Sequence, residues 1–568
     1  MPEPAAAAQT LTPPRPGAWE LERTHMTRPP SGFVKSIFPI AMPRGFAKSL
    51  REYGALLEKF DVAIVGGFVY MCTRGVGAPE SAQGPPPRLI FEVMRRIHPE
   101  IRWRIRRAQS VFRDRRWRQD VALWDNEIKP SLLKEGAGLK AEDIAGMTDA
   151  QLADHVQRAA ALLDRAVEGH HRLNMCALLP LGDFLAQATT WTGLTPSALL
   201  EACRGLSTPS AGGALEMAAL KAALLADPEA KALLLSAAAP ASVIDGLLQR
   251  PGAVGEAMGA YLDEMGLRCL GGYDVSELHA RESPELLVRI IRAALAREHS
   301  ADDPAATSRA LAAARAKVPP EHALAFDALF EEVRVTYRIR DERNFFGDAP
   351  AIGLARRAIL EAGRRLKASG AVQAVDHALD ASAGELVALL TGQPGPTAAE
   401  LAERYRFRME ADINAMPDRL GFPPSAPPPD HWLPGDAARV SRAVGVALEM
   451  MFSVRAEPQA APKLLKGFPA SPGVYEGPAR VVREAAELPT VQAGEILITP
   501  ATSPTFNVVL PLIGAIVTER GGALCHAAIV AREYGIPAVV GSVGAMKVIQ
   551  TGMRVRVDGA AGEITLLD

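Results

Sequence analysis

The sequence predicts a multidomain protein in which a mainly α-helical large domain precedes a smaller C-terminal β/α domain. The chain has 568 residues, enough for three or four domains. Ala, Leu and helical spacing dominate up to about residue 455, and short β-branched runs separated by glycines dominate after residue 467. Hydrophobic residues make up 48% and charged residues 23%, as in ordinary soluble proteins, which excludes disorder throughout the chain.

Composition along the chain predicts four segments. Residues 1–18 are rich in Pro and Ala and lack the apolar core of a signal peptide, so we expect a disordered tail. Residues 19–455 form the helical domain and residues 467–568 the C-terminal domain. Between them, residues 456–466 begin with AEPQAAP and predict a semi-rigid linker.

Three stretches of the large domain carry clear helical signals. Apolar residues recur every three or four positions over Asp149–Arg172. Ser283–Arg297 opens with a Ser suited to an N-cap and a Pro suited to the first turn, and Pro350–Leu366 is also typical of a helix. Val62–Cys72 differs, because two β-prone runs flank Gly66-Gly67 and predict a hairpin.

Charge and cysteine usage limit the possible partners and compartments. The formal net charge is −2, so no global field favours nucleic acid or a membrane surface. Five cysteines lie far apart without a CxxC pair, which favours a reduced, cytoplasmic setting. The apolar stretches are too short to span a bilayer. We find no HExxH and no paired Cys/His cluster, so no metal site is predicted.

Arg88–Arg118 holds eleven arginines together with Trp103 and Trp117. Such a segment could bind nucleic acid or an acidic partner. The alternative is one amphipathic helix with an apolar face formed by Ile97, Ile101 and Ile105. The near-zero net charge favours this second interpretation, and we do not expect nucleic acid to be a partner.

The most informative segment is Gly514–Gly541, GAIVTERGGALCHAAIVAREYGIPAVVG. Its first apolar residues predict a buried strand, and two adjacent glycines then predict a loop. His526 begins a helical run that Gly535 and Pro537 end, and a further strand follows. The sequence therefore predicts a single histidine where a Gly-rich turn enters a helix.

A histidine at a helix N-terminus suits a phosphorylated imidazole, because free N–H groups and the helix dipole stabilise an anion there. A neutral imidazole can attack phosphorus and later release the phosphoryl group to a second acceptor. From residue spacing alone, the alternative is that His526 has only a structural role near the start of the helix. A Cys525–His526 nucleophile pair is disfavoured, because adjacent residues of a helix do not face each other.

This segment closely resembles the mobile phosphohistidine domain of the phosphoenolpyruvate-utilising enzymes, whose signature is T-x-x-GG-x-x-(S/C/T)-HAAI-x-ARE-x-GIPAVVG. The resemblance covers about the last 100 residues. It implies a swivelling β/α domain that carries phosphate on His526, with Thr518 as a hydrogen-bond partner of that ring. The same signature implies loop support from Gly521, Gly522, Cys525 and Arg532.

Residues 19–455 are similar to the helical acceptor-binding region of the rifampin phosphotransferase group. Trp19–Pro30, WELERTHMTRPP, resembles its W-x-x-D-x-x-H-x-x-R-P opening, with Glu22 in place of the usual acid. The resemblance implies four acceptor-site candidates: Arg340, Arg343, His25 and Arg28. Asn344 stands where the resemblance predicts a Lys, which argues against rifampin itself as the acceptor of the phosphoryl group. A solvated helical face and an ordinary structural contact are the alternatives for these residues.

We expect the chain to act as an incomplete phosphotransferase of the dikinase type. It has no GxxxxGK[ST] motif and no recognisable ATP-grasp segment. By analogy with phenylphosphate synthase, we expect no cofactor on this chain alone and ATP with Mg²⁺ on an ATP-grasp partner. The phosphoryl group would pass to a small hydroxyl or carboxylate acceptor. The alternative is a non-enzymatic phosphocarrier or regulatory protein whose helical domain binds another protein.

Overall fold

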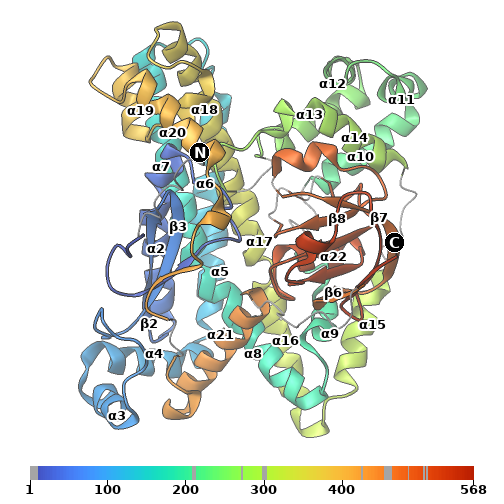
Figure 1. Ribbon diagram of the computed structural model, residues 1–568. Coiled ribbons are helices and arrows are strands. Elements are labelled where there is room, and N and C mark those ends of the chain that lie inside the picture. The colour runs from blue at the N-terminus through green and yellow to red at the C-terminus, as the bar shows by residue number, and fades with distance from the viewer. Residues whose placement is uncertain are drawn as a thin grey trace, which may run out of the picture.

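The computed structural model describes residues 11–207, 213–269, 273–296, 304–423, 427–452, 463–483, 485–502, 506 and 509–567. Figure 1 shows a large helical region and, on its right, a C-terminal module built around a sheet. The predicted fold class is therefore confirmed. Of the predicted linker, only the last residues lie within the described part of the chain, where Leu464 begins β5.

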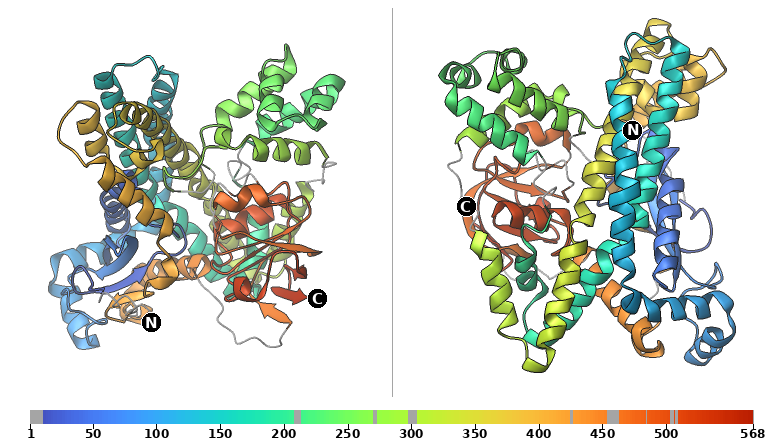
Figure 2. Two further views of the ribbon diagram at one scale, coloured as in Figure 1. Left: turned by 45° about the horizontal axis from the view of Figure 1, so that its top comes forward. Right: turned by 180° about the vertical axis from the view of Figure 1, so that it is seen from behind.

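Long helices form a pillar along one side of the molecule (Figure 2). They are α2 (Phe38–Glu52), α7 (Asp149–Arg172) and α18 (Ala349–Ala368), while the long helix α8 (Asn174–Thr192) packs against α16 (Ala323–Thr336) and α21 (Gly435–Phe452). The helices predicted over 149–172 and 350–366 are confirmed. A capping box at Thr148 and Gln151 starts α7, which explains why its first residue matches the prediction.

The other helices of the large region are mostly shorter. They are α1 (Gly32–Lys35), α6 (Lys129–Ala141), α9 (Pro196–Leu200), α10 (Ala214–Ala226), α11 (Pro228–Leu235), α12 (Pro240–Leu248), α13 (Ala253–Met265), α14 (Pro284–Ala296), α15 (Pro304–Arg315), α16 (Ala323–Thr336), α17 (Ile339–Arg343), α19 (Ala383–Leu390), α20 (Ala398–Glu410) and α21 (Gly435–Phe452). Helix α14 confirms the prediction over 283–297. Two π-helical turns interrupt this series, η1 (Trp124–Ile128) and η6 (Asn344–Asp348).

The helical region also contains a four-stranded sheet in the order β2-β3-β1-β4. The strands are β1 (Ala18–Leu21), β2 (Leu57–Val65), β3 (Phe68–Gly75) and β4 (Arg419–Gly421). The predicted hairpin is confirmed: Gly66 and Gly67 have φ of 56° and 86°, which a two-residue turn of type I′ requires. Local sequence did not predict β1 and β4, because their pairing joins segments from opposite ends of the helical region.

Strand β1 includes part of the segment predicted to be a disordered tail. The indole of Trp19 donates to the Arg15 carbonyl at 3.0 Å, and Phe422 N donates to the Gly17 carbonyl at 2.9 Å. The described residues 11–18 therefore belong to the fold, while residues 1–10 lie outside the described part.

The arginine-rich segment is not one helix, and this part of the prediction is wrong. It forms α3 (Arg88–Ile97), α4 (Pro99–Asp114) and α5 (Arg116–Leu123). Pro99 starts a new helix, and Arg115 takes a left-handed conformation with φ of 45°. Ile97 is therefore 68% exposed, although two other residues of the predicted apolar face, Ile101 and Ile105, are buried.

Many of these arginines are engaged within the protein. Arg104 is buried and donates to the carbonyls of Ala55 and Leu57, both at 2.7 Å. Arg116 pairs with Asp120, and Arg118 pairs with Glu332. These contacts support the structural interpretation of the segment.

The C-terminal module contains an eight-stranded sheet in the order β5-β12-β11-β7-β8-β9-β10-β6. Strands β7 to β10 run parallel, and the outer strands pair antiparallel. The elements are β5 (Leu464–Lys466), β6 (Phe468–Ser471), β7 (Val474–Val481), β8 (Ile496–Thr499), β9 (Ala515–Thr518), α22 (His526–Tyr534), β10 (Ala538–Val540), α23 (Ala545–Val548), β11 (Arg554–Asp558) and β12 (Glu563–Leu566). The strands and helix predicted around His526 are confirmed.

The module lies between two groups of helices, α10–α14 on one side and α9, α15 and α16 on the other (Figures 1 and 2). A buried apolar cluster joins Leu220 and Leu287 of the first group to Leu510 and Val530 of the module. A second cluster joins Phe184 of α8 to Leu524 of the module. The His-bearing loop is therefore held close to the helical region.

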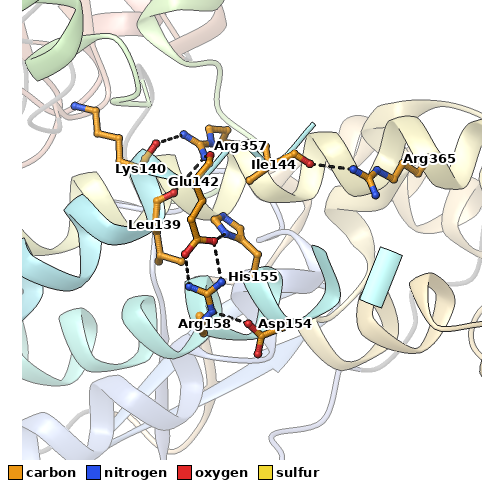
Figure 3. A network of polar contacts seen from close by, with 9 residues as sticks. All are labelled: Leu139, Lys140, Glu142, Ile144, Asp154, His155, Arg158, Arg357 and Arg365. Atoms are coloured by element: carbon orange, nitrogen blue, oxygen red, sulfur yellow. Dashed lines mark hydrogen bonds and ion pairs between the residues drawn. The ribbon is translucent and has the colours of Figure 1, made fainter. Parts of the chain in front are cut away.

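A polar network braces the helical pillar (Figure 3). Arg357 of α18 donates to the carbonyls of Lys140 and Glu142 at 2.8 and 2.7 Å, where α6 ends. The carboxylate of Glu142 in turn bonds Arg158 and His155 of α7. Since the last carbonyls of a helix lack partners within the helix, this arginine stabilises the end of α6 and ties three helices together.

Candidate active site

His526 is the first residue of α22, directly after the glycine-rich loop that follows β9. Gly521 has φ of 99°, a backbone conformation that residues other than glycine rarely adopt. Cys525 occupies the N-cap position, and Gly535 ends the helix with φ of 62°. The imidazole thus lies half-buried at the positive end of a helix, as predicted.

Arg532 supports the loop from inside the module. The residue is 3% exposed, and its guanidinium donates to the carbonyls of Ala523 in the loop and Ala470 in β6, at 2.9 and 2.8 Å. A charged donor satisfies two buried carbonyls in this way. The side chain therefore holds the loop that presents His526.

Thr518 is fully buried at the end of β9, and its hydroxyl proton has a main-chain partner. Its hydroxyl donates to the Arg520 carbonyl at 2.7 Å, and its carbonyl accepts from Ser542 N at 2.9 Å. The hydroxyl proton therefore stabilises the turn after β9 and is not donated to the imidazole of His526.

The loop docks onto the last turn of α21. Gly522 N and Leu524 N donate to the carbonyls of Met451 and Met450, at 3.1 and 2.8 Å. A Cβ atom at Gly522 would lie 2.2 Å from the Met450 carbonyl oxygen. Glycine is needed here because another backbone approaches closely. The docked loop also satisfies carbonyls that a helix end leaves without partners.

The surroundings of His526 keep its imidazole neutral at pH 7. Burial lowers the pKa of His526 to about 4, with nearby Arg340 and His25 acting in the same direction and Asp341 opposing them. These three residues all belong to the helical region. A neutral imidazole is the form that can attack phosphorus.

Arg340 and Arg343 lie on α17, next to the docked loop. Arg340 donates through Nη2 to the Leu524 carbonyl, and within the described residues its buried Nη1 has no hydrogen-bond acceptor. Arg343 points into the helical region, where Nη1 donates to the His170 carbonyl at 2.8 Å and to Asn174. Of the two predicted arginines, Arg340 is the one beside the imidazole of His526.

His25 follows β1 and is oriented by the carboxylate of Glu22. Glu22 Oε1 accepts from the backbone N–H groups of Thr24 and His25, and lies 3.3 Å from His25 Nδ1. The nearby histidine and these N–H groups lower the pKa of Glu22 to about 2, although its burial acts the other way. Tyr273 contacts the His25 ring edge-on at 5.1 Å.

A cavity of about 270 Å³ lies between this opening segment and the C-terminal module. Its lining includes two of the predicted acceptor-site residues, His25 and Arg28, with Tyr405 and Arg408 of α20. Arg483, Thr499 and Phe506 come from the module. The structure therefore places His25 both at this cavity and near His526. Arg340 lies near His526 but is not among the described residues that line the cavity.

Sequence patterns did not predict a buried polar group behind this site. His170 Nδ1 lies 2.5 Å from Asp348 Oδ2, and burial raises the pKa of Asp348 well above its usual value. Burial also lowers the pKa of His170 well below its usual value. Asp348 ends the π-helical turn η6, and such turns are found frequently at functional sites. Because a π-helical turn has no sequence signature, the sequence did not predict this pair.

Neither a metal-ligating cluster nor an apolar helix of membrane-spanning length is found among the described residues. Among them, no group of three or more His, Cys, Asp or Glu side chains is arranged to hold a metal ion. None of the helices in this part of the chain combines the length and the apolar character needed to cross a membrane.

Two protein families match the sequence. The family described as "PEP-utilising enzyme, mobile domain" matches residues 491–562, which contain His526. The family described as "Rifampicin phosphotransferase fourth domain" matches residues 177–359, which contain Arg340 and Arg343. The two matches therefore fall on the two sides of the docked site.

Comparison with individual proteins agrees with these matches. Rifampicin phosphotransferase from a Streptomyces species is 33% identical over 328 residues, which cover 55% of this chain and 34% of the relative. Phosphoenolpyruvate synthase from Pyrococcus furiosus is 46% identical over 106 residues, 19% of this chain and 13% of the relative. The chain thus spans about a third or less of the length of these relatives.

Among solved structures, aconitase X of Thermococcus kodakaraensis in its holo form matches 18% of this chain and 98% of that chain, with 28% identity and a TM-score of 0.16. That score is too low to compare the folds. The two family matches and the individual relatives agree on the classification of the sequence. Over its two matched regions, the chain is similar to the phosphoenolpyruvate-utilising enzymes.

Proposed function

We propose that the chain is a phosphotransferase subunit of the dikinase type. In this proposal His526 takes a phosphoryl group from ATP and Mg²⁺ bound on a separate ATP-grasp protein. It then passes the group to a small hydroxyl or carboxylate compound bound by the helical region. The observation that carries the proposal is the docking of the His526 loop beside Arg340, Asp341 and the His25 cavity.

The local chemistry supports a phosphohistidine at this position. The ring is neutral at pH 7, so a nitrogen lone pair is available to attack phosphorus. The N-terminus of α22 and the guanidinium of Arg340 are both positive, and they favour the dianionic phosphoryl group that the ring would carry. Arg340 would act as an electrostatic clamp of the kind that phosphoryl transfer requires.

A donor site and an acceptor site on separate proteins require the carrier to leave its docked position. Within the described part of the chain, the loop tip makes few polar contacts with the helical region, and two of them are main-chain bonds to the end of α21. Such bonds contribute only about 0.5–1.5 kcal/mol each in net terms, so the larger part of the cost of undocking is the separation of the two apolar clusters that join the module to the helical region. We propose that the C-terminal module swivels as a body from this acceptor-facing position to the ATP site of the partner.

The alternative, a phosphocarrier that only binds another protein, predicts a shallow surface in place of a pocket. The cavity beside His25, with Arg28, Arg408 and Arg483 in its lining, is instead typical of a small-molecule site. It favours an enzyme whose acceptor is a metabolite.

Labelling with ATP tests the proposed function. The purified chain should show no ATP turnover alone, and a cognate ATP-grasp protein should transfer label from the β-phosphate of ATP to His526. His526→Asn should abolish the label, while His322→Asn, which removes a ring stacked on Trp191, should not. Equal labelling of His526→Asn would rule out His526 as the carrier.

A further inference from the structure

The pair Glu22–His25 has the geometry of an oriented base. Glu22 is 8% exposed and is fixed by two backbone N–H donors at 2.5 and 2.9 Å. The same oxygen lies 3.3 Å from His25 Nδ1, so the carboxylate engages that nitrogen and leaves Nε2 as the reactive one. A carboxylate behind an imidazole sets its tautomer and raises its basicity.

The ring of His25 lines a cavity and also lies near the proposed phosphate carrier. Its side chain is 41% exposed, and it lines the cavity of about 270 Å³. The same side chain is close enough to His526 to influence its titration. Tyr273 holds the ring from one edge at 5.1 Å. A molecule in the cavity would therefore contact His25, whose side chain is also near His526.

We propose that His25, positioned by Glu22, is the general base that deprotonates a hydroxyl acceptor bound in this cavity. The inference rests on the proposed function, because it assigns the acceptor side of that reaction. It narrows the acceptor to an alcohol or phenol, since a carboxylate is already deprotonated and needs no base. The cavity volume limits it to the size of a small metabolite.

The transfer step balances with the groups named. The P–N bond of phosphorylated His526 breaks, and its electron pair returns to the ring, which leaves as a neutral imidazole because its other nitrogen keeps a proton. A P–O bond forms between phosphorus and the acceptor oxygen. The hydroxyl proton moves to His25 Nε2. General base catalysis of this kind contributes about 10²- to 10⁴-fold to a rate.

Several titratable and charged groups surround His25 and bear on its protonation. They are Glu22 on its own segment, Tyr273 before η4 (Ala280–Glu282), His170 and His171 on α7, and His526 on α22. Glu22 is the acid of this set that is in direct contact with the ring. Its charge and hydrogen bond raise the pKa of His25 above the usual 6.5, although burial acts the other way.

The test uses the full-length chain loaded chemically at His526 with potassium phosphoramidate, so that no partner is needed. Loss of the phosphohistidine to water and to glycerol, as a hydroxyl probe, is followed by ³¹P NMR from pH 5 to 9. We expect a rate that rises with pH as His25 loses its proton. His25→Asn should lower the neutral-pH rate about 10²-fold and remove this step.

Glu22→Gln keeps an oxygen for the two backbone N–H groups but removes the charge, so the step should move to lower pH. His431→Asn, a change at an exposed histidine outside the cavity lining, should leave the profile unchanged. Thermal unfolding checks that each variant is folded. If His25→Asn transfers the phosphoryl group at the wild-type rate and with the wild-type pH profile, His25 is not the general base. That outcome would leave the proposed function of His526 standing. Failure of phosphoramidate to load His526 would overturn the proposed function and this inference together.

Discussion

Gly522→Ala should release the His526 loop from the helical region without distorting the loop itself. Gly522 has no positive φ, so alanine fits its backbone conformation. The new Cβ would nevertheless lie 2.2 Å from the Met450 carbonyl oxygen and 2.7 Å from the Met450 carbonyl carbon. Both are backbone atoms that cannot rotate away, so the loop and α21 must separate.

The expected size of the effect follows from the two hydrogen bonds that separation breaks. These bonds run from Gly522 N to the Met451 carbonyl and from Leu524 N to the Met450 carbonyl. At about 0.5–1.5 kcal/mol each, the docked state becomes less stable by about 1–3 kcal/mol. That change shifts the docking equilibrium about 5- to 150-fold, since 1.4 kcal/mol corresponds to a factor of ten.

Hydrogen–deuterium exchange measures this shift directly. Peptides covering 519–526 and 446–452 should exchange faster in Gly522→Ala, because both sides of the interface lose protection. Gly445→Ala is the matched control on the same helix, since nothing lies within 4 Å of its added Cβ. Wild-type protection of both peptides in Gly522→Ala would refute the docking role of this glycine.

Three further outcomes are expected. Acidification should favour undocking, because the pKa of His526 is about 4 in the docked state and returns to its ordinary 6.5 when the loop undocks. The undocked state then binds the extra proton, so docking weakens as pH falls below 6.5, by about 2 kcal/mol at pH 5. His526→Asn should remove this pH dependence in the same exchange assay. Arg532→Met should lower the free energy of unfolding by about 3 kcal/mol or more, because two buried carbonyls lose a charged donor, whereas the exposed Arg406→Met should cost little in the same thermal melts. Arg340→Met should slow phosphoramidate loading of His526 about 10²-fold with the fold intact, and a wild-type loading rate would contradict its role as a clamp.

Local sequence was sufficient to predict the secondary structure of the C-terminal module around His526. The Gly-Gly loop, the helix from His526 to Tyr534 and the strand from Ala538 are all short-range features, because turn chemistry and periodicity act over a few residues. The hairpin at Gly66-Gly67 was predicted for the same reason. The arginine-rich segment was predicted less well, because Pro99 and the left-handed Arg115 divide it into three helices.

The sequence by itself determined which residue we propose as the phosphate carrier, because one histidine stands where a glycine loop enters a helix. Only the tertiary structure decided what that histidine faces. Arg340 turns toward the docked loop, whereas Arg343, three residues later, turns into the helical region toward Asn174. His25 reaches the same place from a strand paired with β4, at the other end of the helical region. Contacts of this kind depend on packing between distant segments, and no local pattern encodes them.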